Sequence, residues 1–473
     1  MRKTKIVCTL GPACLREDIL EEMLKNGLNV ARLNFSHGTH EYHKKAIALF
    51  RKVRDRLGLP AAVLLDTKGP EIRLKDFEKG GVTLHEGDIF TLTAENILGD
   101  ETRAAISYPD LPRQLCEGVR ILLDDGRVAM TVLEANETEI RCRVDEGGEL
   151  SNHKSINIPN FHIDMPYISK ADEADLIFGI EQDVDFVAAS FVRSAQDVIA
   201  LRKFLDYHGG HSIKIISKIE NIEGVNNFDA ILNHSDGIMV ARGDMGVEVA
   251  FERLPGLQKR FIRRCYQSGK MVITATQMLE SMVHAYTPTR AEITDVANAV
   301  FDGTSAVMLS GETATGEHPA LVVKVMAQIA RQAEKDAFEL DAYRGIGYDS
   351  DTGDITNAIC DAAATTARDV HAKVIIAVTK SGLAARRVSK FRPEQTIVAA
   401  TPEQKTFHQL SLSWGVFPVL SLHQNSTDDL FVHAIDCAKQ SDLVSRGDKA
   451  VITAGVPLNL EGTTNLLKVQ TVS

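Results

Sequence analysis

The sequence lacks the features of several large classes of protein. No apolar run approaches the ~20 residues of a membrane-spanning helix, and no tract of low complexity is present. Residues 1–4 lead directly into a predicted strand, without the apolar segment of a signal peptide. We therefore expect a globular protein of the cytoplasm with no membrane partner.

The sequence also contains few cysteines and fewer basic than acidic residues. The seven cysteines contain no CxxC pair and are odd in number, which favours reduced thiols over a disulfide framework. The 53 Lys and Arg residues are outnumbered by 64 Asp and Glu residues, so the formal charge is −11. Binding to nucleic acid requires a cationic face, and we expect no such partner.

The length predicts about three domains, at ~150 residues each. Eight apolar runs alternate with helical stretches, and eight is the number of strands in a closed (β/α)8 TIM barrel. An open doubly wound sheet is the alternative. The predicted strands are Lys5–Leu10, Asn29–Phe35, Ala61–Asp66, Asp185–Phe191, Ile213–Ile219, Gly237–Ala241, Met271–Ala275 and Ser305–Leu309.

Two further segments interrupt or follow this alternation. From Gly69 to about Pro166, short strands and glycine turns predict a small β-barrel inserted into the third βα loop, where it would act as a lid. After a polar linker at Arg344–Asp349, a second alternation predicts an open-sheet α/β domain. We expect the barrel to comprise residues 1–69 and 168–343, the lid residues 70–167, and the C-terminal domain residues 344–473.

The stretch Lys214–Val249 carries the strongest chemical signal. Lys218 and Glu220 stand two apart at the end of a strand, so they point to the same side. The next strand stops at a predicted turn that contains Asp244, and parallel strands end on one rim, so Glu220 and Asp244 can share a hard cation such as Mg2+. Lys218 would then face a transferred phosphoryl group. Salt-bridged acids with a counterion lysine are the alternative.

Two other predicted strands end in polar residues. Strand two closes with Arg32, Asn34 and Ser36, which share one parity, and the arginine offers a bidentate fork for phosphate or carboxylate. An arginine paired to an acid within the barrel is the alternative. Strand three ends at Asp66 and Thr67, and oxygens from both strand ends could bind a hard cation. A bland surface turn is the alternative here.

Seven motifs, in order and at barrel spacing, resemble those of pyruvate kinase. The resemblance extends over essentially the whole chain. It implies transfer of the phosphoryl group of phosphoenolpyruvate to ADP, giving pyruvate and ATP in the last step of glycolysis, by a homotetramer. The motifs are ARLNFSHG (31–38), DTKGPEIR (66–73), IISKIEN (215–221), DGIMVARGDMG (236–246), ATQMLESM (275–282), PTRAEITDVANA (288–299) and MLSGETA (308–314).

The resemblance also implies roles in phosphoryl transfer. Lys218 would stabilise the phosphoryl group in flight, and Arg32 would grip the phosphate. Glu220 and Asp244 would hold Mg2+ (or Mn2+), and a second Mg2+ would arrive on the nucleotide. Thr276 would join the relay that protonates the enolate.

Further residues match substrate contacts in the family. The substrate carboxylate would lie against the hydroxyl of Thr276 and the backbone around Gly243 and Asp244. The nucleotide contacts would be Asn34, His37, Arg73 and Lys154, the last carried by the lid.

A monovalent cation is implied as well. The side chains of Asn34, Ser36 and Asp66 and the carbonyl group of Thr67 match K+ ligands. Glu71 lies nearby, and family members with Glu at this position need K+, whereas those with Lys do without it. The resemblance therefore implies that this chain needs K+.

The C-terminal domain would be regulatory. The turn formed by Thr379, Lys380, Ser381 and Gly382 joins a strand to a helix, and the helix start offers backbone N–H groups to an anion. Regulated family members bind a phosphorylated effector there, with Ala454–Val456 and Glu461–Asn465 as the other wall. Fructose 1,6-bisphosphate, AMP, a sugar monophosphate and no effector remain alternatives, as does an ordinary turn.

Two other functions remain open at this point. One is a different Mg2+-dependent barrel enzyme that handles pyruvate enolate, such as a carbon–carbon lyase or a phosphonomutase. The other is a catalytically silent metabolite sensor that uses only the C-terminal turn.

Overall fold

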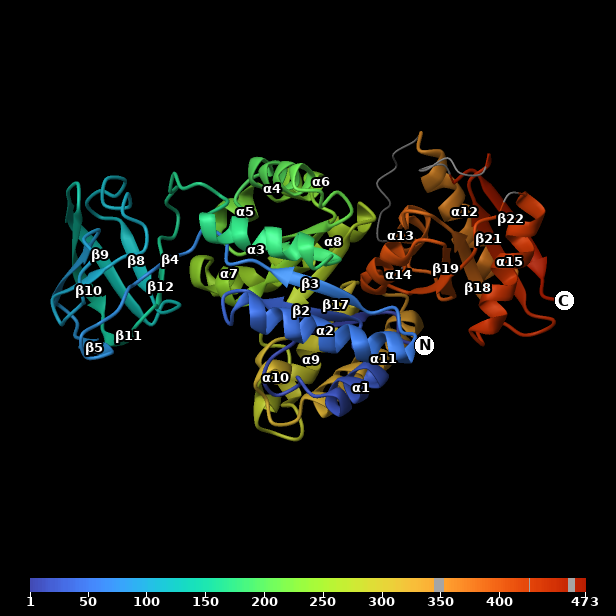
Figure 1. The fold of residues 1–473 in the computed structure, drawn as a ribbon, viewed down its shortest axis with the longest axis horizontal. Helices are drawn as coiled ribbons and strands as arrows, with labels where there is room; N and C mark the ends of the chain where they lie inside the picture. The colour runs from blue at the N-terminus through green and yellow to red at the C-terminus, as the bar shows by residue number, and fades with distance from the viewer. Residues whose placement is uncertain (344–352, 425, 458–463) are drawn as a thin grey trace.

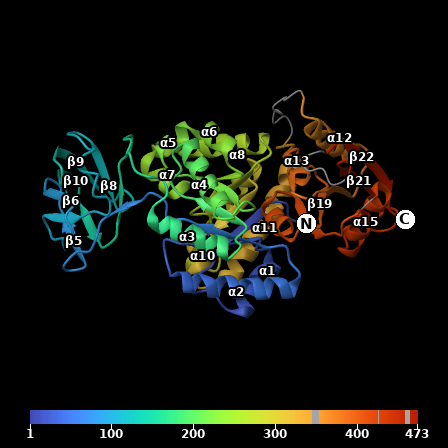
Figure 2. The same cartoon turned by 45° about the horizontal axis from the view of Figure 1, so that its top comes forward.

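The computed structural model describes residues 1–343, 353–424, 426–457 and 464–473. The molecule is elongated, with the inserted segment at one end, a barrel in the middle and the C-terminal sheet at the other end (Figures 1 and 2). The predicted linker Arg344–Asp349 lies outside the described residues, as does the part of Glu461–Asn465 before Thr464.

Eight parallel strands close the central barrel, which confirms the TIM fold over the open sheet. Their bounds differ from the predicted ones by at most two residues. The strands are buried on both faces, which explains why their sequences are continuously apolar rather than alternating. In spatial order they are β1 (Lys5–Thr9), β17 (Ala306–Leu309), β16 (Met271–Ala275), β15 (Gly237–Ala241), β14 (Lys214–Ile219), β13 (Phe186–Ala189), β3 (Ala62–Asp66) and β2 (Val30–Asn34).

Helices surround the barrel and bury one face each against it. Several begin with side-chain caps that satisfy their first N–H groups; α9 starts with a capping box between Thr289 and Glu292. The main helices are α1 (Glu17–Asn26), α2 (His40–Leu57), α3 (Lys170–Glu181), α4 (Ala195–Tyr207), α5 (Ile222–Asn226), α6 (Phe228–His234), α8 (Leu254–Gln267), α9 (Arg290–Phe301) and α11 (Pro319–Glu339). Two short helices, α7 (Arg242–Glu248) and α10 (Gly311–Ala314), follow β15 and β17 directly.

The inserted segment forms a mostly antiparallel sheet with its own core. A bridge between Leu74 and Ile106 links the chain just after the two outer strands, so the sheet closes into the small barrel that was predicted. Its strands are β4 (Ile72–Arg73), β12 (Ser155–Asn157), β8 (Arg120–Leu123), β9 (Val128–Ala135), β10 (Glu139–Glu146), β6 (Ile89–Thr93) and β7 (Arg103–Ala105), and a separate pair joins β11 (Gly148–Ser151) to β5 (Gly81–Leu84). Of these strands, only β6 and β7 pair in parallel.

The C-terminal domain is the expected open α/β sheet, in the order β20, β19, β18, β21, β22. Helices lie on both of its faces (Figure 1). The strands are β18 (Val374–Val378), β19 (Thr396–Thr401), β20 (Val416–Leu420), β21 (Lys449–Ala454) and the antiparallel β22 (Leu466–Thr471), and the helices are α12 (Ile355–Asp369), α13 (Leu383–Lys390), α14 (Gln404–Gln409) and α15 (Thr427–Gln440).

This domain plugs the end of the barrel at which the strands begin. Leu412, at the end of the 3-10 turn η3 (Leu410–Leu412), is fully buried among the side chains that fill the barrel interior. Next to it, the buried Trp414 packs its ring 4.5 Å from the Arg392 guanidinium. The Lys5 ammonium of β1 donates to the carbonyl oxygen of Val416 at 2.6 Å. The C-terminal domain therefore contributes one side chain, that of Leu412, to the core of the barrel interior.

Two further expectations can be compared with the structure. All seven cysteines are unpaired, as predicted. Among the described residues, no helix is both long enough and apolar enough to span a membrane.

We predict that Leu412→Ala lowers the free energy of unfolding by about 2–5 kcal/mol, because the lost side chain leaves a cavity in a packed interior. The check is urea unfolding followed by the fluorescence of Trp414, the single tryptophan, which lies at this interface. Leu422→Ala is the control, since Leu422 in the same domain is 72% exposed; equal midpoints for the two variants would contradict the plug.

Candidate active site

The residues singled out from the sequence gather at the carboxyl ends of the barrel strands, where TIM-barrel enzymes place their chemistry. Arg32 lies on β2, Asp66 ends β3 and Lys218 lies near the end of β14. Glu220 follows β14 directly. The closed barrel places β2 next to β3, and β13 between β3 and β14, so these side chains converge on one rim.

A chain of buried charges runs along this rim. The Lys218 ammonium lies 2.9 Å from Glu220 Oε1 and 3.1 Å from Asp66 Oδ1. The second oxygen of Asp66 accepts from Arg32 Nε at 2.6 Å. Two cations and two carboxylates therefore alternate. Lys218 and Glu220 point to the same side, as predicted, and they pair with each other, which was the alternative stated for them. Arg32 is paired to an acid within the barrel, which was the alternative stated for it.

Burial and charge shift the pKa of each group in this chain. Burial by itself disfavours the Lys218 ammonium, but the Asp66 and Glu220 carboxylates outweigh it and raise its pKa above the ordinary value. Burial likewise opposes the Asp66 carboxylate, but Arg32 and Lys218 lower its pKa. At Glu220, burial and the charge of Asp244 together exceed the effect of Lys218 and raise the pKa to about 8.

Glu220 and Asp244 form an acidic pair that suits a divalent cation. One oxygen of Glu220 accepts from the backbone N–H of Phe191 at 2.6 Å, which fixes the carboxylate. Asp244 acts electrostatically on both Glu220 and Lys218. Two carboxylates supply oxygen donors, which Mg2+ prefers.

Asp244 lies in a helix rather than in the predicted turn. The helix α7 begins at Arg242, directly after β15, and Asp244 is in its first turn. An acid at this point is favoured by the partial positive charge of a helix start. Sequence reasoning expected a turn because Gly243 and Gly246 flank this residue.

Thr276 joins Gly243 across the ends of two neighbouring strands. The Thr276 hydroxyl accepts from the Gly243 N–H at 2.8 Å and donates to the carbonyl oxygen of Ala275 at 2.6 Å. Thr276 directly follows β16, so its hydroxyl lies at the rim, as the sequence indicated.

The predicted K+ ligands lie on adjacent strands. Asn34 of β2 stands opposite Asp66 of β3 in the strand ladder. Both Asp66 oxygens already accept bonds from cations, and the Thr67 carbonyl oxygen accepts from the Ser190 hydroxyl at 2.7 Å. Ser36, however, is exposed and lies beyond the end of β2.

The placement of Ser36 on the strand was therefore wrong. The backbone N–H of Ser36 donates to Asn34 Oδ1 at 3.2 Å. An asparagine side chain that bonds the backbone two residues on competes with the strand and turns the chain. The strand therefore ends at Asn34, and the alternation of side chains that was expected to continue to Ser36 stops there.

The predicted nucleotide contacts are divided between the barrel and the lid. His37 is exposed on the turn after β2, and its carbonyl oxygen accepts from the His43 ring at 2.8 Å. Arg73 forms a two-bond pair with Glu71, at 2.6 and 2.8 Å. Lys154 pairs with Asp124 at 2.8 Å within the lid. In this conformation the two lid cations therefore bind lid carboxylates.

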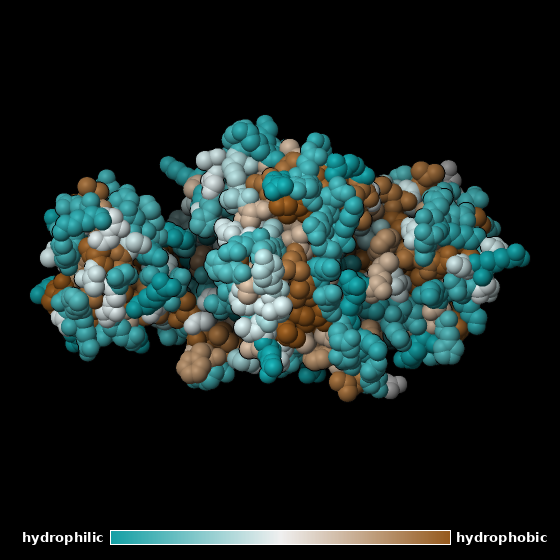
Figure 3. Space-filling view, turned by 90° about the horizontal axis from the view of Figure 1, so that it is seen from below, coloured by the Kyte–Doolittle hydropathy of each residue, from teal (hydrophilic) through white to brown (hydrophobic). Residues whose placement is uncertain are grey.

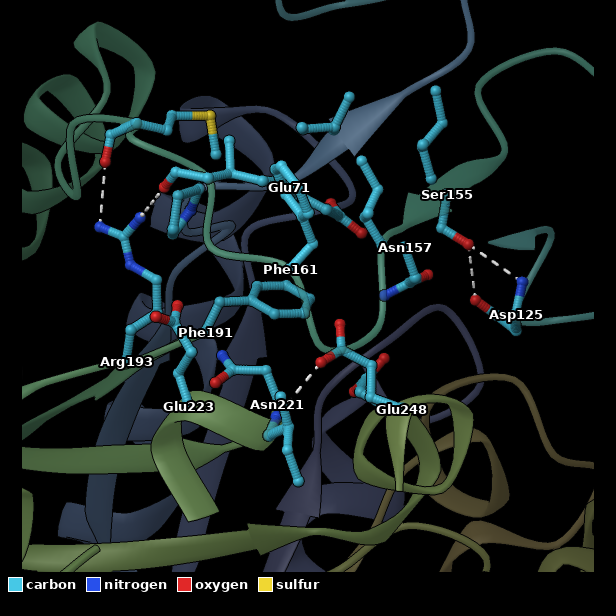
Figure 4. A pocket seen from close by; sticks show the side chains of 18 residues that line it. Glu71, Asp125, Ser155, Asn157, Phe161, Phe191, Arg193, Asn221, Glu223 and Glu248 are labelled. Atoms are coloured by element: carbon cyan, nitrogen blue, oxygen red, sulfur yellow. Dashed lines mark hydrogen bonds between the residues drawn. The ribbon is translucent and has the colours of Figure 1, made fainter. Parts of the chain in front are cut away.

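A narrow cleft with a cavity volume of about 90 Å3 lies between the lid and the barrel and reaches Asp244. The surface is visibly hollowed between these two parts (Figure 3). Figure 4 shows Glu71 and Asn157 facing the cleft from the lid, with Asn221 and Glu248 opposite them on the barrel.

The sequence analysis missed two residues at the rim. The Ser190 hydroxyl accepts from Lys218 at 2.7 Å, donates to the Thr67 carbonyl oxygen, and lies 3.2 Å from Asp66 Oδ1. The Thr9 hydroxyl accepts from Arg32 at 2.9 Å. A polar residue at the end of an apolar barrel strand is the signal that could have identified both.

The predicted effector turn lies in the C-terminal domain, away from the rim (Figure 1). Gly382 has a φ of 80° and caps α13, and its N–H donates to the Thr379 hydroxyl at 3.0 Å. Lys380 and Ser381 complete the turn, and the Ser381 carbonyl oxygen accepts from Arg386 at 3.2 Å.

Comparison with known proteins agrees with this geometry. A family model described as "Pyruvate kinase, barrel domain" matches residues 1–323, and one described as "Pyruvate kinase, alpha/beta domain" matches residues 357–470. The pyruvate kinase of Clostridium acetobutylicum is 47% identical over 473 residues, which is 100% of both chains. That of Geobacillus stearothermophilus is 47% identical over 474 residues, covering 100% of this chain and 81% of the relative. Matches of this identity over the whole length show that the chain belongs to the pyruvate kinase family.

Proposed function

We propose that Lys218, Arg32 and Thr276 carry out the reaction of this family, the transfer of the phosphoryl group of phosphoenolpyruvate to ADP to give pyruvate and ATP. The observation that supports these assignments is the buried chain of charges at the rim, with the cations of Lys218 and Arg32 on either side of Asp66. Preorganised cations of this kind stabilise the negative charge of a phosphoryl group in flight.

Lys218 is the residue that faces the moving phosphoryl group. Its raised pKa keeps the ammonium charged, and its pairing with Asp66, Glu220 and the Ser190 hydroxyl fixes the direction of the side chain. Because the charge is already in place, no reorganisation is needed when the transition state forms. Arg32, held by Asp66, grips the phosphate of the substrate.

Glu220 and Asp244 are the residues that would hold Mg2+ or Mn2+. Among the described residues, no group of three or more His, Cys, Asp or Glu side chains is arranged to bind a metal ion. A cation held by two carboxylates keeps its other positions for water and substrate oxygens, which is the usual arrangement for Mg2+. The bound ion would neutralise charge on the substrate's carboxylate and phosphoryl oxygens.

Gly243 and Thr276 provide the site for the substrate carboxylate. The Gly243 N–H now donates to the Thr276 hydroxyl, and that hydroxyl donates to the Ala275 carbonyl oxygen. Binding the substrate carboxylate would exchange these two acceptors for carboxylate oxygens. The hydroxyl also belongs to the relay that protonates the enolate after the phosphoryl group has left.

The nucleotide binds where the lid meets the barrel. Asn34 and His37 contact it from the barrel, and Arg73 and Lys154 contact it from the lid. At present Arg73 pairs with Glu71 and Lys154 pairs with Asp124. When the lid closes, both cations would leave these carboxylates and bind the phosphates of ADP. This proposal treats residues 70–167 as a lid inserted between barrel segments 1–69 and 168–343.

A K+ ion bound near the same strand ends would complete the site. Asn34, Ser36, Asp66 and the Thr67 carbonyl group are its ligands in this proposal, and Glu71 determines the requirement for the ion. The pairing of Asn34 with Asp66 across β2 and β3 supports the assignment.

Residues 344–473 form a regulatory domain in a cytoplasmic homotetramer under the same proposal. The turn Thr379–Gly382 binds a phosphorylated effector at the start of α13, which has eight residues. Assays with fructose 1,6-bisphosphate, AMP and sugar monophosphates identify the effector, and an absence of response to all of them would remove this part of the proposal.

We expect Lys218→Met to lower kcat by about 10^3-fold or more, with little change in the KM for phosphoenolpyruvate, because the lost interaction belongs to the transition state. The measurement is steady-state ATP formation from phosphoenolpyruvate and ADP. Lys214→Met is the matched control at the other end of β14, where Lys214 pairs with Asp236. A loss of only a few-fold at Lys218 would remove it from this role.

We expect ATP formation to depend on K+ in the native chain and to become independent of it in Glu71→Lys. A lysine ammonium can stand where the ion would lie. Titration of activity with KCl at constant ionic strength is the check, and Glu78→Lys, an exposed lid position, makes the same charge change as the control. An unaltered K+ dependence in Glu71→Lys would refute the assignment.

A further inference from the structure

The turn that carries Thr276 has an unusual backbone. Thr276 has a φ of 70° and Gln277 a φ of 52°, so two consecutive residues other than glycine occupy the left-handed region. This conformation is rare, and for a β-branched residue such as threonine it is a genuine outlier. Such strain persists only where the surrounding structure holds the backbone in place.

The side chain of Arg242 provides that hold. Its guanidinium donates to the carbonyl oxygens of Ala275 at 3.1 Å and Thr276 at 2.5 Å, and it reaches that of Gln277 at 3.4 Å. Three consecutive carbonyl groups of the strained turn therefore point at one cation. The fork of an arginine, with five donors in a plane, suits such a cluster, whereas a lysine could not span it.

Asp295 anchors this guanidinium from the outer layer. Both oxygens of Asp295, on α9, lie within 2.7 Å of Arg242 Nη1. The Arg242 side chain is 15% exposed, so water competes little with these bonds. Arg242 also precedes Gly243, whose N–H bonds the Thr276 hydroxyl. Arg242 thus binds the carbonyl groups of the strained turn and is the chain neighbour of Gly243, which bonds the Thr276 hydroxyl.

We infer that Arg242, held by Asp295, is a positioning residue for Thr276 in the protonation of the enolate. The inference rests on the proposed function of Thr276. After the phosphoryl group leaves, the enolate carbon takes one proton, supplied by solvent through the relay, and becomes the methyl group of pyruvate. Without the clamp the turn relaxes, and the hydroxyl leaves the place where this proton is passed on.

The test separates protonation from phosphoryl transfer. NMR follows the exchange of pyruvate methyl protons for solvent deuterium with Mg2+, K+ and ATP present, and ATP formation from phosphoenolpyruvate is measured in parallel. We expect Arg242→Ala to slow methyl exchange by about 100-fold, which is the effect of a misplacement of ~1 Å. Added guanidinium ion should restore much of the rate by occupying the vacated site.

Two further variants complete the design. Asp295→Asn keeps the cation but weakens its anchor, and it should show a smaller loss of exchange; it decides the question if Arg242→Ala does not fold. Arg202→Ala is the control, because Arg202 also donates to two carbonyl groups, those of Gly210 and Ile213, but far from the rim. Arg202→Ala should exchange the methyl protons of pyruvate at the native rate, and added guanidinium ion should not change that rate.

Two results would overturn the inference. One is native exchange in both Arg242→Ala and Asp295→Asn. The other is a loss in folded Arg242→Ala that guanidinium leaves unchanged. A native chain that forms no ATP from phosphoenolpyruvate and ADP would instead overturn the proposed function, so the two failures are distinguishable.

Discussion

The buried pairing of Lys218 with Asp66 is the interaction on which the site depends. Each charge at the rim is too deeply buried to stand alone, because desolvation would neutralise or expel it. Asp66 neutralises two buried cations, since one of its oxygens binds Lys218 and the other binds Arg32. Glu220 pairs with Lys218 as well, and its other oxygen accepts from the backbone N–H of Phe191.

The two ends of the barrel serve different purposes. At the end where the strands begin, Leu412 from the C-terminal domain fills the interior, and the Lys5 ammonium joins β1 to the start of β20. At the other end, the charged side chains gather at the rim, and a cleft between the barrel and the lid reaches Asp244. A rigid, plugged barrel allows the rim to hold strain, as at Thr276 and Gln277, without loss of order.

Much of the fold and part of the site could be read from the sequence. Continuous apolar runs predicted all eight barrel strands, because strands buried on both faces must be apolar throughout. The spacing of Lys218 and Glu220 predicted that they share a side, because side chains in a strand alternate with a period of two. The same rule failed at Ser36, where the Asn34 side chain turns the chain before the next alternation.

Only the tertiary structure decided which groups meet. Arg242 gave no distinct local pattern, since its importance lies in its partners elsewhere in the chain, such as Asp295 on α9. The left-handed backbone at Thr276 was equally hidden, because no glycine marks it. The sequence by itself determined the strands, their order and the residue types at their ends, because these follow from local periodicity. The closure of the barrel determined the contacts, because it brings together residues that lie far apart along the chain.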